Sequence, residues 1–193
     1  MQRSGVLNVP NTLSLARIIL APFLMVLLIA RSGPYTYAAA GLFLAAALTD
    51  WLDGRIARTT GQVSVMGQLL DPVADKLLIT AALFALVQVG RVPAWMALLV
   101  VGREIVVTGL RAVAAAQGVI IVASDFGKAK MAAQVLAVTL LILGGSPLVW
   151  AAGIAALSVA LVLAVGSGVD YFWKYLARAL AGRAAGPQAG GKG

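Results

Sequence analysis

The chain has 193 residues, of which 61% are hydrophobic and only 11% charged, and its mean hydropathy is +0.96. A soluble domain of this length carries far more charge on its surface, so the composition excludes that class and indicates an integral membrane protein. The absence of cysteine and histidine excludes disulfides, thiolate nucleophiles and the usual zinc ligand sets, so any bound metal must be held by oxygen.

The apolar residues form six runs, each near the ~20 residues that cross a bilayer as a helix. Gly and Pro interrupt them at 31–34, 90–93 and 144–147, and polar stretches at 58–66 and 117–128 supply the other breaks. The predicted spans are 12–30, 35–57, 68–89, 93–116, 129–145 and 148–173. The fold class expected is therefore all-α, an integral membrane bundle of six transmembrane helices.

Segments flanking the bundle have their own patterns. Residues 1–10 mix Arg3 with apolar side chains and are expected to lie along the membrane interface. Residues 11–176 are expected to form one six-helix transmembrane domain, and the Gly- and Ala-rich residues 177–193 a cytoplasmic tail that is disordered. A cleaved signal peptide is the alternative for the first span, but Arg17 and Pro22 interrupt its apolar region and no small-residue cleavage site follows.

The placement of lysine and arginine predicts a multi-pass protein of the cell (inner or plasma) membrane with both termini in the cytoplasm. In that orientation the outer loops carry only Arg31 and Arg91. The inner side carries Arg3, Arg17, Arg55, Arg58, Lys128, Lys130, Lys174, Arg178, Arg183 and Lys192. The net charge of +8 is thus explained by contact with anionic lipid, and no basic patch with interleaved aromatics indicates nucleic-acid binding.

Four of the seven acids lie where the second span ends and the third begins. Asp50 and Asp53 fall in the inner third of one span, and Asp71 and Asp75 in the first turns of the next, so both pairs reach one depth. At 100° per residue each pair also lies on one stripe of its helix, which it shares with Gly54 or Gly67. Ionisable groups near hydrocarbon are expensive, which makes this cluster a functional hypothesis by default.

Four clustered carboxylates repel one another. Each pair ~4 Å apart costs roughly 4 kcal/mol at an effective dielectric near 20, so the group costs on the order of 10 kcal/mol or more. Marginal stability cannot carry that cost unopposed, so either some carboxyls are protonated or divalent cations neutralise them. Two divalent ions match four carboxylates in charge, and such a pair suits phosphoryl transfer. A purely structural set of helix-end acids paired with Arg55, Arg58 and Lys76 is the competing interpretation.

The run D-x-x-D-G-x-x-A-R, eight residues, G-x-x-x-D-x-x-x-D resembles the signature of the CDP-alcohol phosphotransferases, with no departure from it. Three further segments, at 8–17, 102–111 and 123–130, look like the phosphatidylglycerophosphate synthase branch of that family. The resemblance implies transfer of the phosphatidyl group from CDP-diacylglycerol to a hydroxyl of glycerol 3-phosphate, with release of CMP. It also implies a homodimer, and the orientation predicted from lysine and arginine places the active site on the cytoplasmic side.

Roles for individual residues follow from the same resemblance. Asp50, Asp53, Asp71 and Asp75 would hold two Mg²⁺ ions, with Mn²⁺ as the alternative, and Asp75 would act as general base. Contacts to CDP-diacylglycerol would come from Asn11, Thr12, Gly54, Arg58, Ser64 and Gly67. An acceptor phosphate also needs cations, which Arg103 and Arg111, on roughly one side of the fourth span, would supply, with Glu104 as the structural partner of either. Lys128 and Lys130, at the start of the fifth span, would add to them, with plain cytoplasmic positive charge as the alternative.

Two other functions stay open at this point. The first is the same chemistry with another acceptor, such as phosphatidylglycerol, inositol phosphate or serine. The second is a divalent-cation transporter whose aspartates line a permeation path. A transporter needs access from both faces, whereas all four aspartates lie at the inner level and no acids continue outward, so the pattern favours catalysis.

Overall fold

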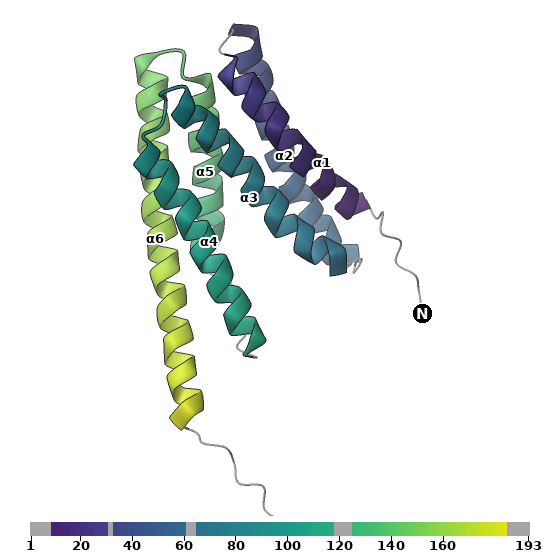
Figure 1. Ribbon diagram of the computed structural model, residues 1–193, viewed down its shortest axis with the longest axis vertical. Helices are drawn as coiled ribbons and strands as arrows, with labels where there is room; N and C mark the ends of the chain where they lie inside the picture. The colour runs from purple at the N-terminus through teal and green to yellow at the C-terminus, as the bar shows by residue number, and fades with distance from the viewer. Residues whose placement is uncertain (1–8, 31–32, 61–64, 118–124, 185–193) are drawn as a thin grey trace, which may run out of the picture.

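The computed structural model describes residues 9–30, 33–60, 65–117 and 125–184 (Figure 1). Within these ranges the described side chains exclude those of residues 9–11, 34, 50–60, 65–72, 75, 125–128 and 178–184. The described part of the chain is all-helical and holds no strand. Its helices are α1 (Val9–Ile29), α2 (Gly33–Thr60), α3 (Val65–Gln88), α4 (Ala94–Ala116), α5 (Asp125–Leu143) and α6 (Pro147–Ala184).

Each predicted span corresponds to one of these helices, so the all-α prediction is confirmed. Most boundaries agree within a few residues, but α6 continues to Ala184, well past the expected end at 173 and into the segment assigned to the tail. The expected end at 173 was placed where hydropathy falls and charged residues begin. Arginine, lysine and alanine are all good helix formers, so the helix continues past that point. Residues 1–8 and 185–193 lie outside the described residues, so the interfacial segment and the disordered tail stay predictions.

The turn between α3 and α4 shows how local sequence ends a helix. Gly90 has φ +72, in the left-handed region that glycine adopts without steric cost. The Arg91 amide donates to the Leu86 carbonyl at 2.8 Å and the Gly90 amide to the Val87 carbonyl at 3.0 Å, as in a Schellman motif. Pro93 then precedes the first residue of α4.

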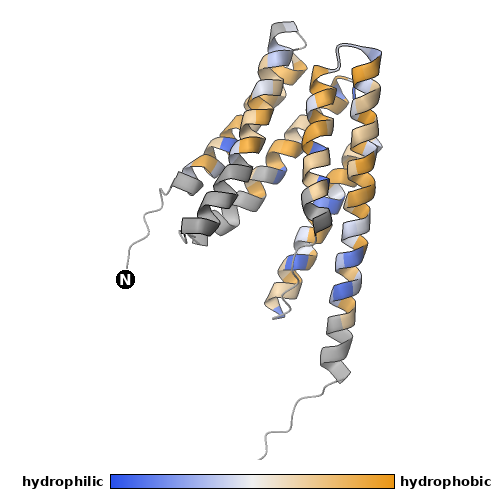
Figure 2. Cartoon of the chain, turned by 180° about the vertical axis from the view of Figure 1, so that it is seen from behind, coloured by the Kyte–Doolittle hydropathy of each residue, from blue (hydrophilic) through white to orange (hydrophobic). Residues whose placement is uncertain are grey.

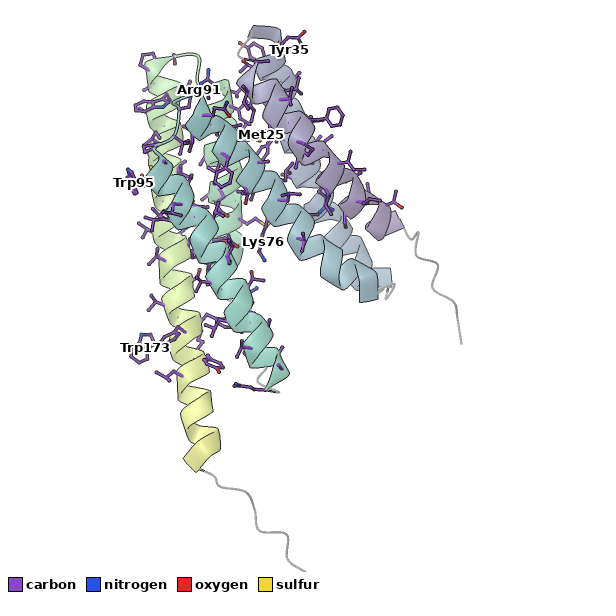
Figure 3. All side chains as sticks on the ribbon, in the orientation of Figure 1. Met25, Tyr35, Lys76, Arg91, Trp95 and Trp173 are labelled. Atoms are coloured by element: carbon purple, nitrogen blue, oxygen red, sulfur yellow. The ribbon has the colours of Figure 1, made fainter. Side chains whose placement is uncertain are left out.

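Arg91 fastens this turn to the other helical hairpin. Its Nη1 donates to the carbonyl oxygens of Leu141, at 3.0 Å, and Ile142, which lie in the last turn of α5. Trp150 Nε1 of α6 in turn donates to the Arg91 carbonyl at 2.9 Å. The turn ends of α3, α4, α5 and α6 are therefore joined by hydrogen bonds at one end of the molecule (Figure 3).

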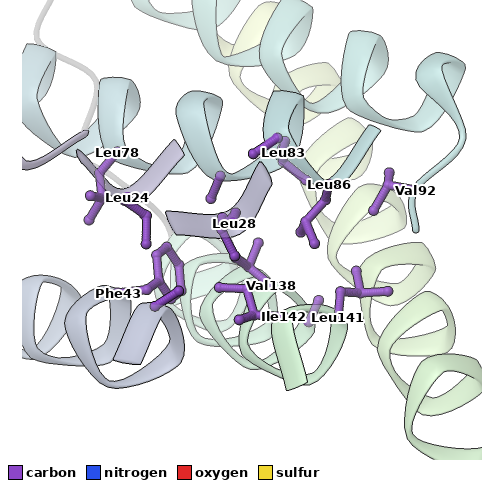
Figure 4. Close-up of a cluster of buried hydrophobic side chains, with 14 of the residues drawn as sticks. Leu24, Leu28, Phe43, Leu78, Leu83, Leu86, Val92, Val138, Leu141 and Ile142 are labelled. Atoms are coloured by element: carbon purple, nitrogen blue, oxygen red, sulfur yellow. The ribbon is translucent and has the colours of Figure 1, made fainter. Parts of the chain in front are cut away.

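The buried core lies between α1, α2, α3 and α5, and α3 packs against α1, α4 and α5. Leu24, Phe43, Leu83 and Ile142 are fully buried there, and they come from four different helices (Figure 4). The α5–α6 hairpin packs closely because Gly153 of α6 sits against Leu141.

Outside this core the helices expose large apolar side chains over most of their length (Figure 2). Such a surface is far more apolar than that of a soluble monomer, and it suits contact with lipid. Among the described residues, two stretches are long and apolar enough to cross a membrane, Thr12–Ile29 and Pro147–Ala177. Shorter apolar helices cover Tyr35–Thr49, Lys76–Gln88 and Ala129–Leu143.

Candidate active site

The aspartate signature occupies the end of the molecule where α2 and α3 meet (Figure 1). Only residues 61–64 connect Thr60 to Val65, so the two helix ends lie no more than about 18 Å apart. All four aspartates of the signature lie within helices: α2 contains Asp50 and Asp53, and α3 contains Asp71 and Asp75.

The helix bounds place the aspartates at matched levels. Asp50 is ten residues before the end of α2 and Asp75 ten residues after the start of α3, or about 15 Å along each axis. Asp53 and Asp71 are seven and six residues from the same ends, or about 10 Å. The two pairs therefore lie at matched distances from the connection between α2 and α3, and their meeting at one depth stays a prediction.

Many of the predicted site residues fall outside what is described. The side chains of Asn11, Asp50, Asp53, Gly54, Arg58, Gly67, Asp71, Asp75 and Lys128 belong to this group, and Ser64 lies wholly in the 61–64 gap. Their roles stay predictions. Thr12 is described, and it lies exposed in the first turns of α1.

A buried ion cluster lies on α4, beyond the aspartates. Arg103 Nη1 donates to Glu104 Oε1 at 2.9 Å, and Lys130 Nζ of α5 donates to the same oxygen. The exposed fractions of the three side chains are 14%, 19% and 11%, so these charges are largely removed from solvent. The expected partnership of Glu104 with an arginine is confirmed, and Lys130 shares it.

Arg103 also reaches the last helix. Its Nε donates to the Ala164 carbonyl at 2.8 Å and its Nη2 to Ser167 Oγ at 2.5 Å. Because three of its donors already have protein acceptors, Arg103 holds α4 to α6 in addition to any contact with a ligand. The role of Ser167 as a partner of Arg103 was not predicted from the sequence, although a serine within an apolar run is a signal that could have indicated it.

Arg111 belongs to a different part of the surface. It is exposed, and its guanidinium lies 5.4 Å from the ring centroid of Tyr171 on α6. Eight residues separate it from Arg103, or about 12 Å along α4. Both arginines contact α6, which confirms that they lie on roughly one side of α4, but Lys130 joins the Glu104 partner of Arg103 and not Arg111.

Lys76, which the sequence suggested only as a possible ion-pair partner of the aspartates, adds a cation that contacts α4. It directly follows Asp75 on α3, and its Nζ donates to Thr108 Oγ1 of α4 at 2.5 Å. Thr108 in turn donates to the Glu104 carbonyl at 2.7 Å. Figure 3 shows Lys76 between α3 and α4, so this lysine connects the helix of Asp75 to the ion cluster.

Arg17 is a second residue whose placement differs from the sequence interpretation. It was counted only as a charge of the inner surface, yet it is 4% exposed and lies one turn after the fully buried Ser14 on α1. Helix α1 packs along α3. The motif at 8–17 ends on this arginine, so the resemblance contained a signal that spacing alone did not.

A cavity of about 70 Å³ opens beside the ion cluster, between α3, α4 and α5. Its polar lining comes from Lys76, Thr80, Glu104, Lys130 and Gln134. Lys76, Arg103, Lys130 and Glu104 together carry a net charge of +2 among the described side chains, so this region favours an anionic guest. A larger cavity of about 170 Å³ lies at the opposite end, where Arg91 is already bound to carbonyl oxygens of α5.

Comparison with known proteins identifies a matching family model and several relatives of this chain. Residues 7–178 match the family model described as CDP-alcohol phosphatidyltransferase. The chain is 42% identical to "CDP-diacylglycerol--glycerol-3-phosphate 3-phosphatidyltransferase" of Bacillus subtilis, over 86% of this chain and 94% of the relative. It is 36% identical to "Probable phosphatidylglycerophosphate synthase" of Mycobacterium tuberculosis, over 92% and 84%.

A third relative, "CDP-diacylglycerol--glycerol-3-phosphate 3-phosphatidyltransferase" of Rickettsia typhi, is 35% identical over 86% of this chain and 95% of its own. The family model covers α1 through most of α6, and with them both halves of the aspartate signature and the ion cluster. The resemblance inferred from the motifs is confirmed by these matches: the chain belongs to the CDP-alcohol phosphatidyltransferase family.

Proposed function

We propose that this protein transfers the phosphatidyl group from CDP-diacylglycerol to a hydroxyl of glycerol 3-phosphate, forming phosphatidylglycerol phosphate and releasing CMP. The observation that carries the proposal is the complete aspartate signature on α2 and α3, in a chain 42% identical over most of its length to a relative named for this reaction. The matched levels of the two aspartate pairs support a single site formed by both helices.

The charge of the ion cluster supports a phosphorylated acceptor. A phosphate monoester carries about −1.5 to −2 at neutral pH, which the net +2 of Lys76, Arg103, Lys130 and Glu104 would balance. An uncharged or zwitterionic alcohol such as serine offers no such phosphate to this region. Arg111 and Lys128 would add cations nearer the aspartate end. Arg111 follows the cluster along α4, which runs toward that end, and Lys128 precedes it along α5, which runs away from that end.

The aspartates fit divalent cations by the chemistry of their donors. Asp50, Asp53, Asp71 and Asp75 offer only carboxylate oxygens, the ligands that Mg²⁺ takes in proteins, and Mn²⁺ is the alternative. When bound, two such ions would balance the charge of the four carboxylates and would stabilise charge on the attacking and leaving oxygens.

The residues of the chain would divide the remaining work. Asp75 accepts the proton of the attacking hydroxyl as its oxygen bonds to the lipid-bearing phosphorus, and the bond from that phosphorus to the CMP oxygen breaks with its electron pair. Asn11, Thr12, Gly54, Arg58, Ser64 and Gly67 would hold the cytidine diphosphate portion. The small residues of this set let a ligand approach the backbone closely.

The membrane arrangement is part of the proposal. Six helices cross the bilayer with both termini and the active site on the cytoplasmic side, as the distribution of lysine and arginine indicates. Lipid substrate then reaches the site from the inner leaflet, whereas the soluble acceptor and CMP exchange with the cytoplasm. A homodimer is expected from the family resemblance.

The test is CMP release from CDP-diacylglycerol by the purified full-length protein in lipid–detergent micelles, measured by chromatography. Release should require Mg²⁺, stop on chelation, and occur with glycerol 3-phosphate but not with serine, inositol phosphate or phosphatidylglycerol. We expect Asp75→Asn to abolish release while part of the nucleotide binding remains. Asp170→Asn is the matched control, because Asp170 is an exposed aspartate of α6 that pairs with Lys174 at 2.6 Å.

Three results would contradict the proposal in different ways. Asp75→Asn turning over at the wild-type rate would reject the assignment of the base. Release with another acceptor alone would replace glycerol 3-phosphate. No release with any acceptor, together with Mg²⁺ flux into reconstituted vesicles, would favour the transporter instead.

A further inference from the structure

The cavity between α3, α4 and α5 has two ends of different character. The register of the helices defines them, because α3 and α5 run away from the aspartate end and α4 runs toward it. Lys76, Glu104 and Lys130 lie at the level nearer the aspartates. Thr80 and Gln134 each follow one of these lysines by four residues, so they lie about 6 Å further into the bundle.

At the cavity end farther from the aspartates, Gln134 has a buried polar atom that lacks a hydrogen-bond partner within the described residues. It is 2% exposed, and within the described residues its Nε2 has no hydrogen-bond acceptor. Buried polar groups are normally hydrogen-bonded, and an amide left without a partner costs free energy comparable to a lost hydrogen bond. Since Gln134 lines the cavity, a guest there would supply the missing oxygen.

The lining determines which kind of oxygen this is. Lys76, Lys130 and Gln134 Nε2 present donors, whereas the Glu104 carboxylate in the lining already accepts from Arg103 and Lys130. The guest is therefore expected to offer lone pairs, and a cation is disfavoured. Around the level of Gln134 the cavity wall is uncharged, with Val100 and Val101 from α4 and Thr80 from α3. An ionised phosphate oxygen is strongly disfavoured against such a wall, whereas a neutral hydroxyl bonded to an amide is tolerated.

We propose that Gln134 determines acceptor specificity by donating a hydrogen bond to the hydroxyl of the phosphorylated polyol that does not react. The phosphate lies at the lysine end, and the neutral hydroxyl reaches the amide about one helical turn deeper. This inference rests on the proposed function, since it concerns the acceptor of that same reaction. It adds a residue of α5 that no charge or motif in the sequence singled out.

The test compares two acceptors. Glycerol 3-phosphate has the middle hydroxyl, and 3-hydroxypropyl phosphate keeps the phosphate and the terminal hydroxyl but lacks the middle one. We expect wild-type kcat/KM to favour glycerol 3-phosphate by about 10- to 100-fold, because a site built to bond a hydroxyl rejects the analogue that lacks it. In Gln134→Met, which keeps the length of the side chain, this preference should fall below about threefold through loss on glycerol 3-phosphate alone.

Thr139→Val is the matched control on the same helix. Thr139 is 8% exposed and its hydroxyl donates to the Val135 carbonyl of its own helix at 2.7 Å, away from the cavity lining. This variant should keep the wild-type preference between the two acceptors. A purely structural role of Gln134 would lower kcat/KM for both acceptors equally in Gln134→Met, and that result would overturn the proposal.

The behaviour of the wild-type protein separates failure of this inference from failure of the proposed function. If the wild-type protein uses both acceptors equally well, it does not recognise the middle hydroxyl, and the proposal fails whatever the variant does. If wild type releases CMP with glycerol 3-phosphate and Gln134→Met keeps the full preference, only this inference fails. If wild type releases no CMP with glycerol 3-phosphate, the proposed function and this inference fail together.

Discussion

Replacing Glu104 by glutamine tests how the ion cluster holds the helices together. The carboxylate of Glu104 faces Arg103 and Lys130, whose side chains are 14% and 11% exposed. Glutamine has nearly the same shape and keeps an oxygen that accepts a hydrogen bond. The substitution therefore removes one charge and leaves two largely buried cations facing each other without the carboxylate between them.

The magnitude follows from the geometry. Unit charges 2.9 Å apart attract by about 6 kcal/mol at an effective dielectric of 20. Desolvation of the charged groups offsets part of this attraction, and losing one partner of a buried pair costs about 3–5 kcal/mol in measured cases. Because glutamine still accepts one hydrogen bond, we expect a loss near the lower limit, ~3 kcal/mol. For a chain of this length that lowers Tm by about 6–12 °C.

The assay is thermal unfolding of the detergent-solubilised protein, followed by tryptophan fluorescence and by loss of the monodisperse peak in size-exclusion chromatography. Asp170→Asn is again the control, because Asp170 and Lys174 are 42% and 51% exposed and a surface pair contributes about 0–1 kcal/mol. If Glu104→Gln unfolds within about 2 °C of Asp170→Asn, the cluster does not stabilise the fold and the reasoning from burial is wrong.

Two further predictions use other helix contacts. In Gly153→Ala the new Cβ would lie 2.8 Å from Leu141 Cγ and should destabilise the α5–α6 contact by about 1–3 kcal/mol. Gly166→Ala is the control, because an added Cβ there meets nothing within 4 Å, and it should keep or raise Tm in the same melting assay. A lower Tm in both variants would contradict the close contact between Gly153 and Leu141. Arg111→Ala should raise KM for the acceptor roughly tenfold and KM for CDP-diacylglycerol much less, since it removes an exposed cation near Tyr171. The opposite ranking in steady-state kinetics would remove Arg111 from the acceptor site.

Helix positions could be predicted from the sequence because each depends on local properties. A run of apolar residues must satisfy its backbone hydrogen bonds internally, and Gly90 and Pro93 end and begin helices for reasons contained in their own covalent structure. The end of α6 was misplaced because hydropathy detects the membrane boundary and not the end of the helix. Ala- and Arg-containing sequence continues a helix beyond the apolar region.

The aspartate pairs were also within reach of the sequence, because their levels depend only on distance from one short connection. Asp50 and Asp75 lie equally far from the helix ends, and helix geometry converts that count into distance along each axis. The cations were not predictable in the same way. Arg103 and Arg111 share a face of α4, yet only one of them joins Lys130 and Glu104.

The sequence by itself therefore determined which segments are helical, which helices carry carboxylates, and at what level those carboxylates lie, since these properties belong to single helices or to neighbours in the chain. Only the tertiary structure decided that Lys76 reaches Thr108, that Arg103 binds Ser167, and that Gln134 lines a cavity beside Lys130. These meetings depend on the rotation and depth of four helices packed against one another. No periodicity within one helix contains that information, because it is set by how side-chain volumes from all four fit together.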